Sequence, residues 1–227
     1  MNKKLPVVEI FQTIQGEGAL AGYKTSFIRL GYCTYRCKWC DTMYAVDPKF
    51  KDKWEQLNSE EIAQRVRGIP ASWVTITGGN PAIHDLTRLI GLLHALKKRV
   101  NIETQGDIPR NWFAACNMTT LSPKPPSSGM TTNWDKLDVC VSLSRRPVLK
   151  VVVDTAEDYH YARQVFHRYP QVSETYLQSC THPGDALEDI VSRWRVLTDT
   201  VLHDSGFLQV AVLPQLHVLL WGHRRGV

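Results

Sequence analysis

The chain has 227 residues, 43% of them hydrophobic, which is enough to bury one good core, and we expect a single domain over residues 1–227. Its formal net charge is +5, but the basic residues form no long run, so nucleic-acid binding is not indicated. It contains no stretch of about 18 apolar residues, so no membrane span is predicted.

The cysteines and the N-terminal segment bear on the compartment. Pro6 and Glu9 interrupt the first residues before the apolar region of a secretory signal forms. Cys116, Cys140 and Cys180 are scattered singly, unlike the cysteines of a disulfide framework. We therefore expect a cytoplasmic protein in a reducing compartment, with no membrane partner.

Short apolar runs rich in β-branched residues alternate with segments of helical period along the chain. The predicted strands are 7–11, 26–30, 73–77, 100–103, 119–121, 148–153, 174–177 and 208–213. The predicted helices are 59–67, 85–98, 156–169 and 186–200, the first opened by Asn58 with Glu61 three residues later. Such alternation requires crossover connections, so we expect a mainly parallel α/β sheet, either a complete barrel or an open partial one.

Three cysteines lie close together in the segment GYCTYRCKWCD, at Cys33, Cys37 and Cys40. This CxxxCxxC spacing offers three thiolates to a metal cluster and withholds a fourth. A [4Fe-4S] cluster held in this way keeps one iron with open positions, which can bind and reduce a small molecule. A zinc site completed by Asp41 or a distant histidine is the alternative that the spacing leaves open.

Unusual motifs follow six of the predicted strands, each at its carboxyl end. In chain order they are the cysteine segment, TGGNP, ETQG, SPKPPSS, LQSC and LPQLH. The carboxyl ends of parallel strands converge on one mouth, where active sites are built. The sequence therefore predicts that all six motifs share one rim.

The cysteine segment, with Trp39 just before its last cysteine, resembles the cluster loop of the radical S-adenosylmethionine (SAM) enzymes. Together with EIFQTIQGEG, TITGGNPA, IETQG, SPKPPSS and VLPQLHVLLWG, it resembles the 7-carboxy-7-deazaguanine synthase (QueE) family over nearly the whole chain. IQGEG is the discriminating motif, because the cysteines alone mark only the superfamily. The resemblance implies a shortened or partial (β/α) barrel of the radical SAM type.

The resemblance also implies a reaction and its participants. The reaction converts 6-carboxy-5,6,7,8-tetrahydropterin to 7-carboxy-7-deazaguanine with loss of ammonia, in the 7-deazapurine (queuosine) pathway. The implied cofactors are a [4Fe-4S] cluster, SAM and Mg²⁺. The implied partners are a second copy of the chain in a homodimer and a flavodoxin-like electron donor.

The site residues follow by resemblance, position by position. Cys33, Cys37 and Cys40 would bind the cluster, and Thr42 would bind Mg²⁺. The residues that would contact SAM are Trp39, Cys40, Asp41, Gly79, Asn80, Ser122, Pro123, Lys124 and Gln178. Those that would contact the pterin are Ile14, Gln15, Gly16, Glu17, Arg29 and Thr77, with Glu103 and His217 as further partners and candidate catalytic groups.

Several of these positions have a plainer interpretation. Arg29 fits either a structural ion pair or the substrate carboxylate, and we favour the carboxylate because a planar fork donor faces the mouth. Glu103 can equally bond to a buried backbone amine or pair with a cation, and His217 can be a core histidine. Asp41 or Thr42 can equally cap a helix.

The glycine motif has two interpretations as well. Gly78 and Gly79 form either an ordinary turn or a close backbone approach to the cofactor. The superfamily's usual GGE reads GGN here, so Asn80 would offer SAM only a neutral carbonyl oxygen.

Two other classes of function share some of these features. A zinc-binding structural module explains the cysteines but leaves IQGEG, GGNP and SPK without a role. A glycyl-radical activase is also small and carries CxxxCxxC, but it acts on a protein partner instead of a free pterin.

Overall fold

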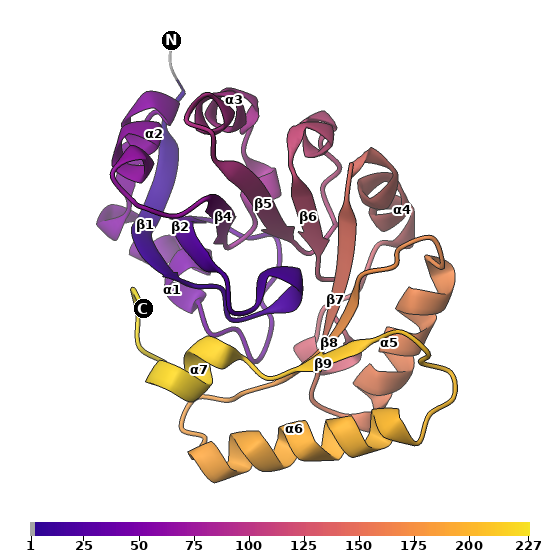
Figure 1. The fold of residues 1–227 in the computed structure, drawn as a ribbon. Helices are drawn as coiled ribbons and strands as arrows, with labels where there is room; N and C mark the ends of the chain where they lie inside the picture. Colours follow the sequence, from indigo (N-terminus) through magenta and orange to yellow (C-terminus); the bar gives the residue numbers. More distant parts are fainter. Residues whose placement is uncertain (1–2) are drawn as a thin grey trace.

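The computed structural model describes residues 3–227, so the first two residues of the predicted domain lie outside it. One nine-stranded sheet runs through the described residues in the order β3-β1-β2-β4-β5-β6-β7-β8-β9 (Figure 1). Neighbouring strands from β2 to β9 are parallel, whereas β1 pairs antiparallel with both β2 and β3. Because β3 and β9 are the two edges, the sheet is open, which is the partial form of the predicted α/β architecture.

The bounds of the elements are as follows. The strands are β1 Leu5–Ile14, β2 Lys24–Leu30, β3 Glu55–Leu57, β4 Trp73–Gly78, β5 Arg99–Thr104, β6 Met118–Leu121, β7 Pro147–Val153, β8 Thr175–Ser179 and β9 Ala211–Leu213. The helices are α1 Met43–Val46, α2 Ser59–Arg67, α3 Thr87–Ala95, α4 Trp134–Leu143, α5 Ala156–Arg168, α6 Leu187–Leu202 and α7 Leu216–Trp221. Across residues 3–227, none of these helices combines the length and apolar character that a membrane crossing requires.

The predicted helix starts are confirmed where the sequence contains an N-cap residue followed by an acidic residue three positions later. Asn58 accepts a hydrogen bond from the Glu61 amide at 2.9 Å, and the Glu61 carboxylate accepts one from the Asn58 amide at 2.7 Å, so α2 begins as predicted. The predicted helix 85–98 is shorter in the structure, because α3 ends at Ala95 and Lys97 has a left-handed φ of 59°. The predicted strand 208–213 is likewise reduced to Ala211–Leu213 at the sheet edge.

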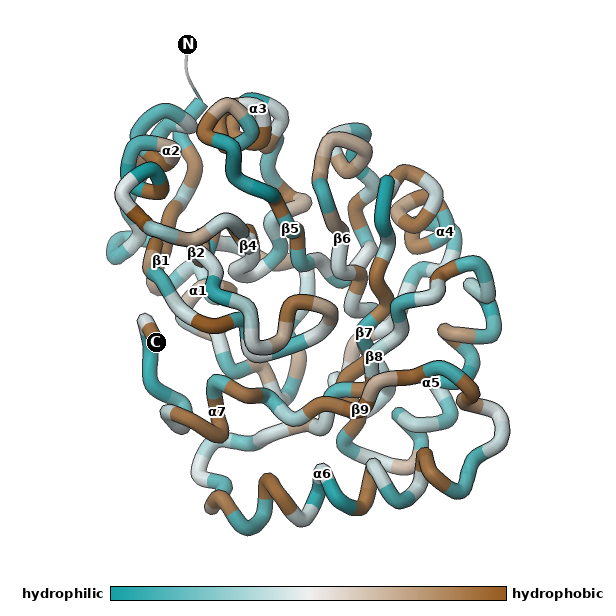
Figure 2. The backbone as a smooth tube through the Cα atoms, viewed as in Figure 1, coloured by the Kyte–Doolittle hydropathy of each residue, from teal (hydrophilic) through white to brown (hydrophobic). Residues whose placement is uncertain are grey.

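The core lies between the sheet and the helices that follow its strands. Ile28, Ile76, Ile102 and Leu149 are fully buried strand residues in one cluster with side chains of α2 to α5. Helix α6 packs on β8 and β9 and is apolar on more than one side, and Figure 2 shows hydrophobic and hydrophilic residues alternating along its length. The pocket that holds the candidate site lies at the carboxyl ends of the parallel strands, outside this core.

Candidate functional site

A pocket opens at the carboxyl ends of the parallel strands, and each of the six predicted motifs contributes to its wall. The strands or the loops directly after them supply Arg29 from β2, Thr77 from β4, Glu103 from β5, Ser122 after β6, Lys150 from β7 and Cys180 after β8. Gln215 and His217 at the start of α7 close the wall. The prediction that the six motifs share one rim is confirmed.

The three motif cysteines all line this pocket and are half-buried. Burial raises the pKa of the Cys37 thiol, while the Lys124 ammonium lowers it and the nearby Cys40 and Cys33 raise it. Burial likewise raises the pKa of Cys40, together with the neighbouring Asp41. The charges of Cys33 and Cys40 therefore reach Cys37, so the three sulfurs lie near one another in the pocket.

The spacing of the motif sulfurs bears on the zinc alternative. A single zinc ion holds its sulfur ligands within about 4 Å of one another. In residues 3–227 the three motif cysteines are not among the side chains whose ligand atoms lie within 4.8 Å of one another. Three half-buried thiols that face one pocket at a wider spacing suit a polynuclear cluster, in which irons and sulfides separate the thiolates.

Cys180 also lines the pocket but does not belong to this group. Its sulfur instead lies within 4.8 Å of ligand atoms of Asp154 and His182. The motif cysteines would therefore hold a cluster through three thiols, which would leave one iron open for a small molecule.

The glycines after β4 pack against the backbone that leads into the cluster loop. The Gly79 amide donates to the Leu30 carbonyl at 3.0 Å, and the Asn80 amide donates to the Tyr32 carbonyl at 2.7 Å. A Cβ atom on Gly78 or Gly79 would collide with those two carbonyl oxygens, and Gly78 has a φ of 136°. The close backbone approach predicted for this motif is present, but it is an approach to the protein's own backbone.

Asn80 is fully buried and lies outside the pocket wall. Its Oδ1 accepts from the Ala82 amide at 3.1 Å and from the Thr104 hydroxyl at 2.8 Å, and its Nδ2 donates to Asp107 at 2.7 Å. All its polar atoms are thus used within the protein. The predicted SAM contact of this side chain finds no support here, and the geometry favours a structural role in the turn.

The other residues predicted to contact SAM divide into two groups. Gln178 is fully buried and donates to the Leu213 carbonyl at 3.1 Å, and neither it nor Pro123 lines the pocket. The remaining ones all line it: Trp39, Cys40, Asp41, Gly79, Ser122 and Lys124.

Trp39, Ser122 and Lys124 form one side of the pocket next to the cluster loop. The Lys124 ammonium donates to the Ser122 hydroxyl at 3.0 Å and lies 5.8 Å from the centre of the Trp39 ring. The Trp39 indole donates to the Ser127 hydroxyl at 2.9 Å. These contacts fix an aromatic face and a cation beside the thiols, a combination that suits a nucleoside with a carboxylate.

Thr42 is the N-cap residue of α1, but its side chain makes no capping hydrogen bond. Its hydroxyl lies 3.6 Å from the Cys40 sulfur and lines the pocket. The alternative of a helix cap therefore accounts for its position but not for its hydroxyl.

The pocket also carries a polar network centred on Glu103. The Gln15 amide donates to Glu103 at 2.6 Å, and the Thr77 hydroxyl donates to it at 3.3 Å. The side-chain carbonyl oxygen of Gln15 accepts a hydrogen bond from the Gly16 amide at 2.7 Å, which is a local contact within the IQGEG segment. Glu103 is thus bonded to two residues predicted to contact the pterin, instead of to buried backbone.

A second network joins Glu17 to Lys150, which the sequence reasoning missed. The Lys150 ammonium pairs with Glu17, and the Gln215 amide donates to the same carboxylate at 2.6 Å. Burial alone would raise the pKa of Glu17, but Lys150 and His217 lower it to about 2. The lysine inside the apolar run PVLKVVV signals that an acidic partner exists, because a charge in a central strand requires one, but it does not identify that partner.

His217 and Arg29 complete the polar rim. Gly16 packs so closely on the His217 ring that a Cβ atom there would collide with it. The Arg29 Nε donates to Glu9 at 2.7 Å, and the Tyr44 hydroxyl donates to the same carboxylate at 3.0 Å. Arg29 therefore forms a structural ion pair through Nε. It also lines the pocket, where it is placed to meet a substrate carboxylate.

An open, mainly parallel sheet with a three-thiol loop after its first parallel strand defines an iron–sulfur protein of the radical SAM class. In agreement, a family model described as a 4Fe-4S single cluster domain matches residues 14–123.

Relatives narrow this class. The chain is 41% identical to the 7-carboxy-7-deazaguanine synthase of Bacillus subtilis (strain 168), with all of both chains aligned. It is 30% identical to that of Thermoplasma acidophilum, over 97% of this chain and 99% of the relative. A crystal structure of QueE from Escherichia coli superposes with a TM-score of 0.73 at 26% identity, covering 94% of this chain and 95% of that one. The chain belongs to the 7-carboxy-7-deazaguanine synthase family.

Proposed function

We propose that the chain is a radical SAM enzyme that converts 6-carboxy-5,6,7,8-tetrahydropterin to 7-carboxy-7-deazaguanine with loss of ammonia, in the 7-deazapurine pathway. The observation that carries this proposal is the composition of the pocket. Its lining combines three thiols, the Trp39 ring and the Lys124 ammonium with two further carboxylates, Glu17 and Glu103, and the Arg29 guanidinium. A cofactor and a polar bicyclic substrate can therefore meet in one pocket.

Cys33, Cys37 and Cys40 would hold the cluster, and Trp39, Asp41, Gly79, Ser122 and Lys124 would position SAM. When bound, the cluster and SAM supply a carbon-centred radical that can take a hydrogen atom from an unactivated position. The protein contributes orientation and exclusion of water, because such a radical can be aimed but not stabilised.

The chain's own residues would recognise the pterin through complementary hydrogen bonds. Glu17 and Glu103 are acceptors for the N–H groups of an aminopyrimidinone edge, and Gln15 offers both a donor and an acceptor. The Arg29 guanidinium would bind the substrate carboxylate through the nitrogens that Glu9 leaves free. His217 lies beside Glu17 and is a candidate for moving a proton during ring contraction.

Thr42 would supply a hydroxyl oxygen to Mg²⁺, which prefers oxygen ligands and keeps several waters. The Thr42 hydroxyl lines the pocket, and it contacts the Cys40 sulfur instead of capping the helix, which supports this assignment. A cation held there would supply positive charge to stabilise the substrate carboxylate.

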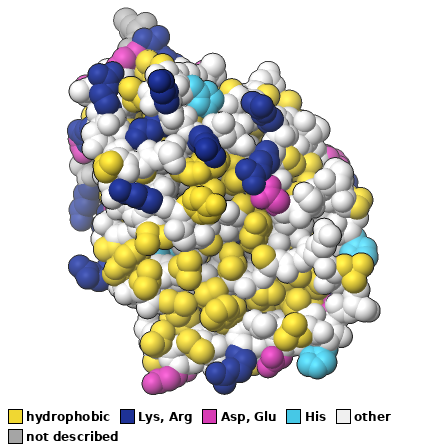
Figure 3. All heavy atoms as spheres, viewed as in Figure 1, with side chains coloured by type: hydrophobic (Ala, Val, Ile, Leu, Met, Phe, Trp, Pro, Cys, Tyr) yellow, Lys and Arg dark blue, Asp and Glu magenta, His cyan; other side chains and the backbone are white. Residues whose placement is uncertain are grey.

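Surface features support the two proposed partners. Leu187, Val196 and Leu202 on α6 are 58%, 63% and 75% exposed, and Figure 3 shows hydrophobic side chains gathered on the lower half of this face, where α6, β9 and α7 lie in Figure 1. An apolar face of this kind suits a second copy of the chain. Arg36 and Lys38 are exposed on the cluster loop and suit an acidic, flavodoxin-like electron donor.

Anaerobic incubation of the cluster-loaded chain with SAM, dithionite, Mg²⁺ and the free carboxypterin tests the proposal. We expect mass analysis to detect the deazaguanine acid, and Cys37→Ala to abolish it while Cys116→Ala does not. A glycyl-radical activase would instead cleave SAM without transforming the pterin. SAM cleavage with no change in the pterin therefore contradicts the proposed function.

A further inference from the structure

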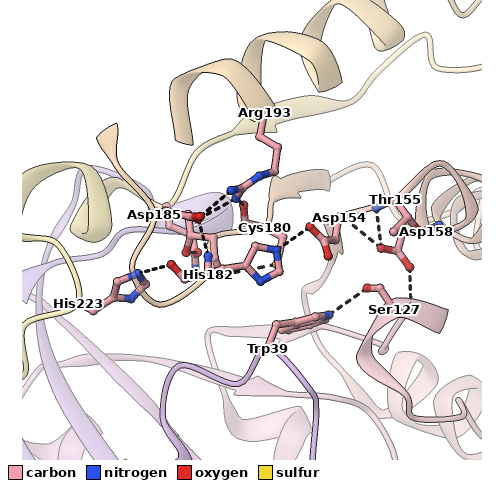
Figure 4. A network of polar contacts seen from close by, with 12 residues as sticks. Trp39, Ser127, Asp154, Thr155, Asp158, Cys180, His182, Asp185, Arg193 and His223 are labelled. Carbon is pink, nitrogen blue, oxygen red and sulfur yellow. Dashed lines mark hydrogen bonds and ion pairs between the residues drawn. The ribbon is translucent and has the colours of Figure 1, made fainter. Parts of the chain in front are cut away.

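A carboxylate, a thiol and an imidazole lie close together after β7 and β8, and the proposed reaction assigns no role to any of them. Asp154, Cys180 and His182 each offer a ligand atom, and these atoms lie within 4.8 Å of one another. Within residues 3–227 this is the one such group of histidine, cysteine and acidic side chains. Figure 4 shows the three side chains together above Trp39.

The sheet brings the three residues together. Val153 at the end of β7 is in register with Ser179 at the end of β8, so the residues that follow the two strands are neighbours. The Cys180 amide donates to the Val153 carbonyl at 3.0 Å, which continues the ladder one step beyond β8. Two residues further on, the His182 Nε2 lies 2.9 Å from the Asp154 carboxylate.

The backbone of these loops is held by groups other than the three side chains. Arg193 donates to the Cys180 carbonyl at 2.8 Å and forms two hydrogen bonds with Asp185, at 2.8 and 2.7 Å. Asp185 in turn accepts from the His182 amide at 2.6 Å. These contacts fix the positions of the ligand atoms, and the positive charge of Arg193 is matched by Asp185.

One further hydrogen bond holds the backbone of each of the two loops, the one after β7 and the one after β8. The His223 ring lies 3.0 Å from the His182 carbonyl, and Asp158 accepts from the Asp154 amide at 3.0 Å (Figure 4). The metal-binding atoms thus sit on a prepared frame, which lowers the ordering cost of binding an ion.

We propose that Asp154, Cys180 and His182 form a binding site for a zinc-class divalent cation, distinct from the cluster site. A thiolate, an imidazole and a carboxylate are the ligands that zinc takes in proteins, whereas Mg²⁺ prefers oxygen ligands alone. The two negative ligands balance the charge of the ion, and three protein ligands leave one position for water. Asp154 and His182 are 20% and 38% exposed, which gives the ion a route from solvent to the buried Cys180.

Zinc can also occupy vacant cluster cysteines, so the test uses the holoenzyme with its full iron content. The protein is dialysed against Zn²⁺ and a competing chelator, and zinc per chain is measured by mass spectrometry. Zinc-edge X-ray absorption then counts the sulfur ligands. We expect one zinc per chain with a single sulfur ligand.

Three variants and two matched controls locate the ion. Cys180→Ser, His182→Asn and Asp154→Asn should each weaken zinc binding by at least about tenfold, the loss that removal of even an outer partner of a metal ligand produces. Cys116→Ser and His203→Asn remove the same residue types elsewhere and should keep the zinc. His182 is partly exposed, so its variant remains informative even if Cys180→Ser fails to fold. The proposal is overturned if no zinc is retained, if more than one sulfur binds it, or if His182→Asn retains it as tightly as the wild type.

Discussion

The buried pair of Lys150 and Glu17 makes the sharpest prediction about the site wall. Their side chains are 7% and 15% exposed, so removing the lysine leaves a carboxylate without its main partner in a poorly solvated place. Breaking a buried pair from one side costs about 3–5 kcal/mol. Since Gln215 still donates to Glu17, we expect Lys150→Met to lower the free energy of unfolding at pH 7 by about 3 kcal/mol, the low end of that range.

The double variant separates charge from packing. Glu17→Gln with Lys150→Met removes both charges of the pair, so it should be more stable than Lys150→Met alone by about 1–3 kcal/mol. Urea denaturation of the cluster-free chains measures all three differences. A Lys150→Met chain within about 1 kcal/mol of the wild type would refute the reasoning, because that is the value of an exposed pair. So would a double variant as unstable as the sum of the single ones.

The pH dependence follows from the direction of each pKa. The pKa of Glu17 is lowered from 4.5 to about 2, so its contribution to stability is present above pH 4.5 and is lost as the pH falls towards 2. In Lys150→Met the lysine no longer opposes the effect of burial, so the pKa of Glu17 is higher than in the wild type. The stability deficit of Lys150→Met should therefore shrink as the pH falls from 7 to 4, because its carboxyl is then neutralised. A deficit that stays constant over this range would show that the lost lysine acts through packing.

Three further variants test other parts of the site. Cys37→Ala should lose both iron and turnover while Cys116→Ala keeps them, and an active Cys37→Ala enzyme would exclude radical SAM chemistry at this loop. Thr42→Ala should raise the Mg²⁺ concentration for half-maximal rate several-fold with an unchanged cluster spectrum; an unchanged Mg²⁺ dependence would leave Thr42 with a structural role only. Asn80→Ala should lower the free energy of unfolding by about 1–3 kcal/mol, because Asp107 and Thr104 each lose one buried hydrogen-bond partner. If urea denaturation shows no loss while SAM titration shows weaker binding, Asn80 contacts SAM after all.

The parts of the fold predicted from the sequence are those with a local chemical signal. The capping box at Asn58 and the apolar runs of the parallel strands depend on nearby residues, so they were recognised. The strand β3 and the helices α1, α4 and α7 are not among the predicted ranges. β3 has three residues, two of them exposed, and α7 is short, so neither carries a full period of the hydrophobic pattern. The antiparallel pairing of β1 with β2 depends on tertiary contacts, so no local sequence pattern predicts it.

The site shows the same division. Motifs at strand ends predicted the pocket wall, because strand direction alone brings those ends together. The partner of Glu17 lies 133 positions away in Lys150, and the group of Asp154, Cys180 and His182 depends on the register of β7 and β8. Contacts of this kind arise from pairing between strands and cannot be read from spacing along the chain.

The most direct test of the central claim is to measure both products of one anaerobic reaction. The cluster-loaded chain is given SAM, a reductant, Mg²⁺ and 6-carboxy-5,6,7,8-tetrahydropterin, and ammonia and 7-carboxy-7-deazaguanine are quantified together. The proposed function predicts equal amounts of the two, and neither when SAM or the reductant is omitted. A fully loaded cluster that cleaves SAM yet forms neither product would contradict it.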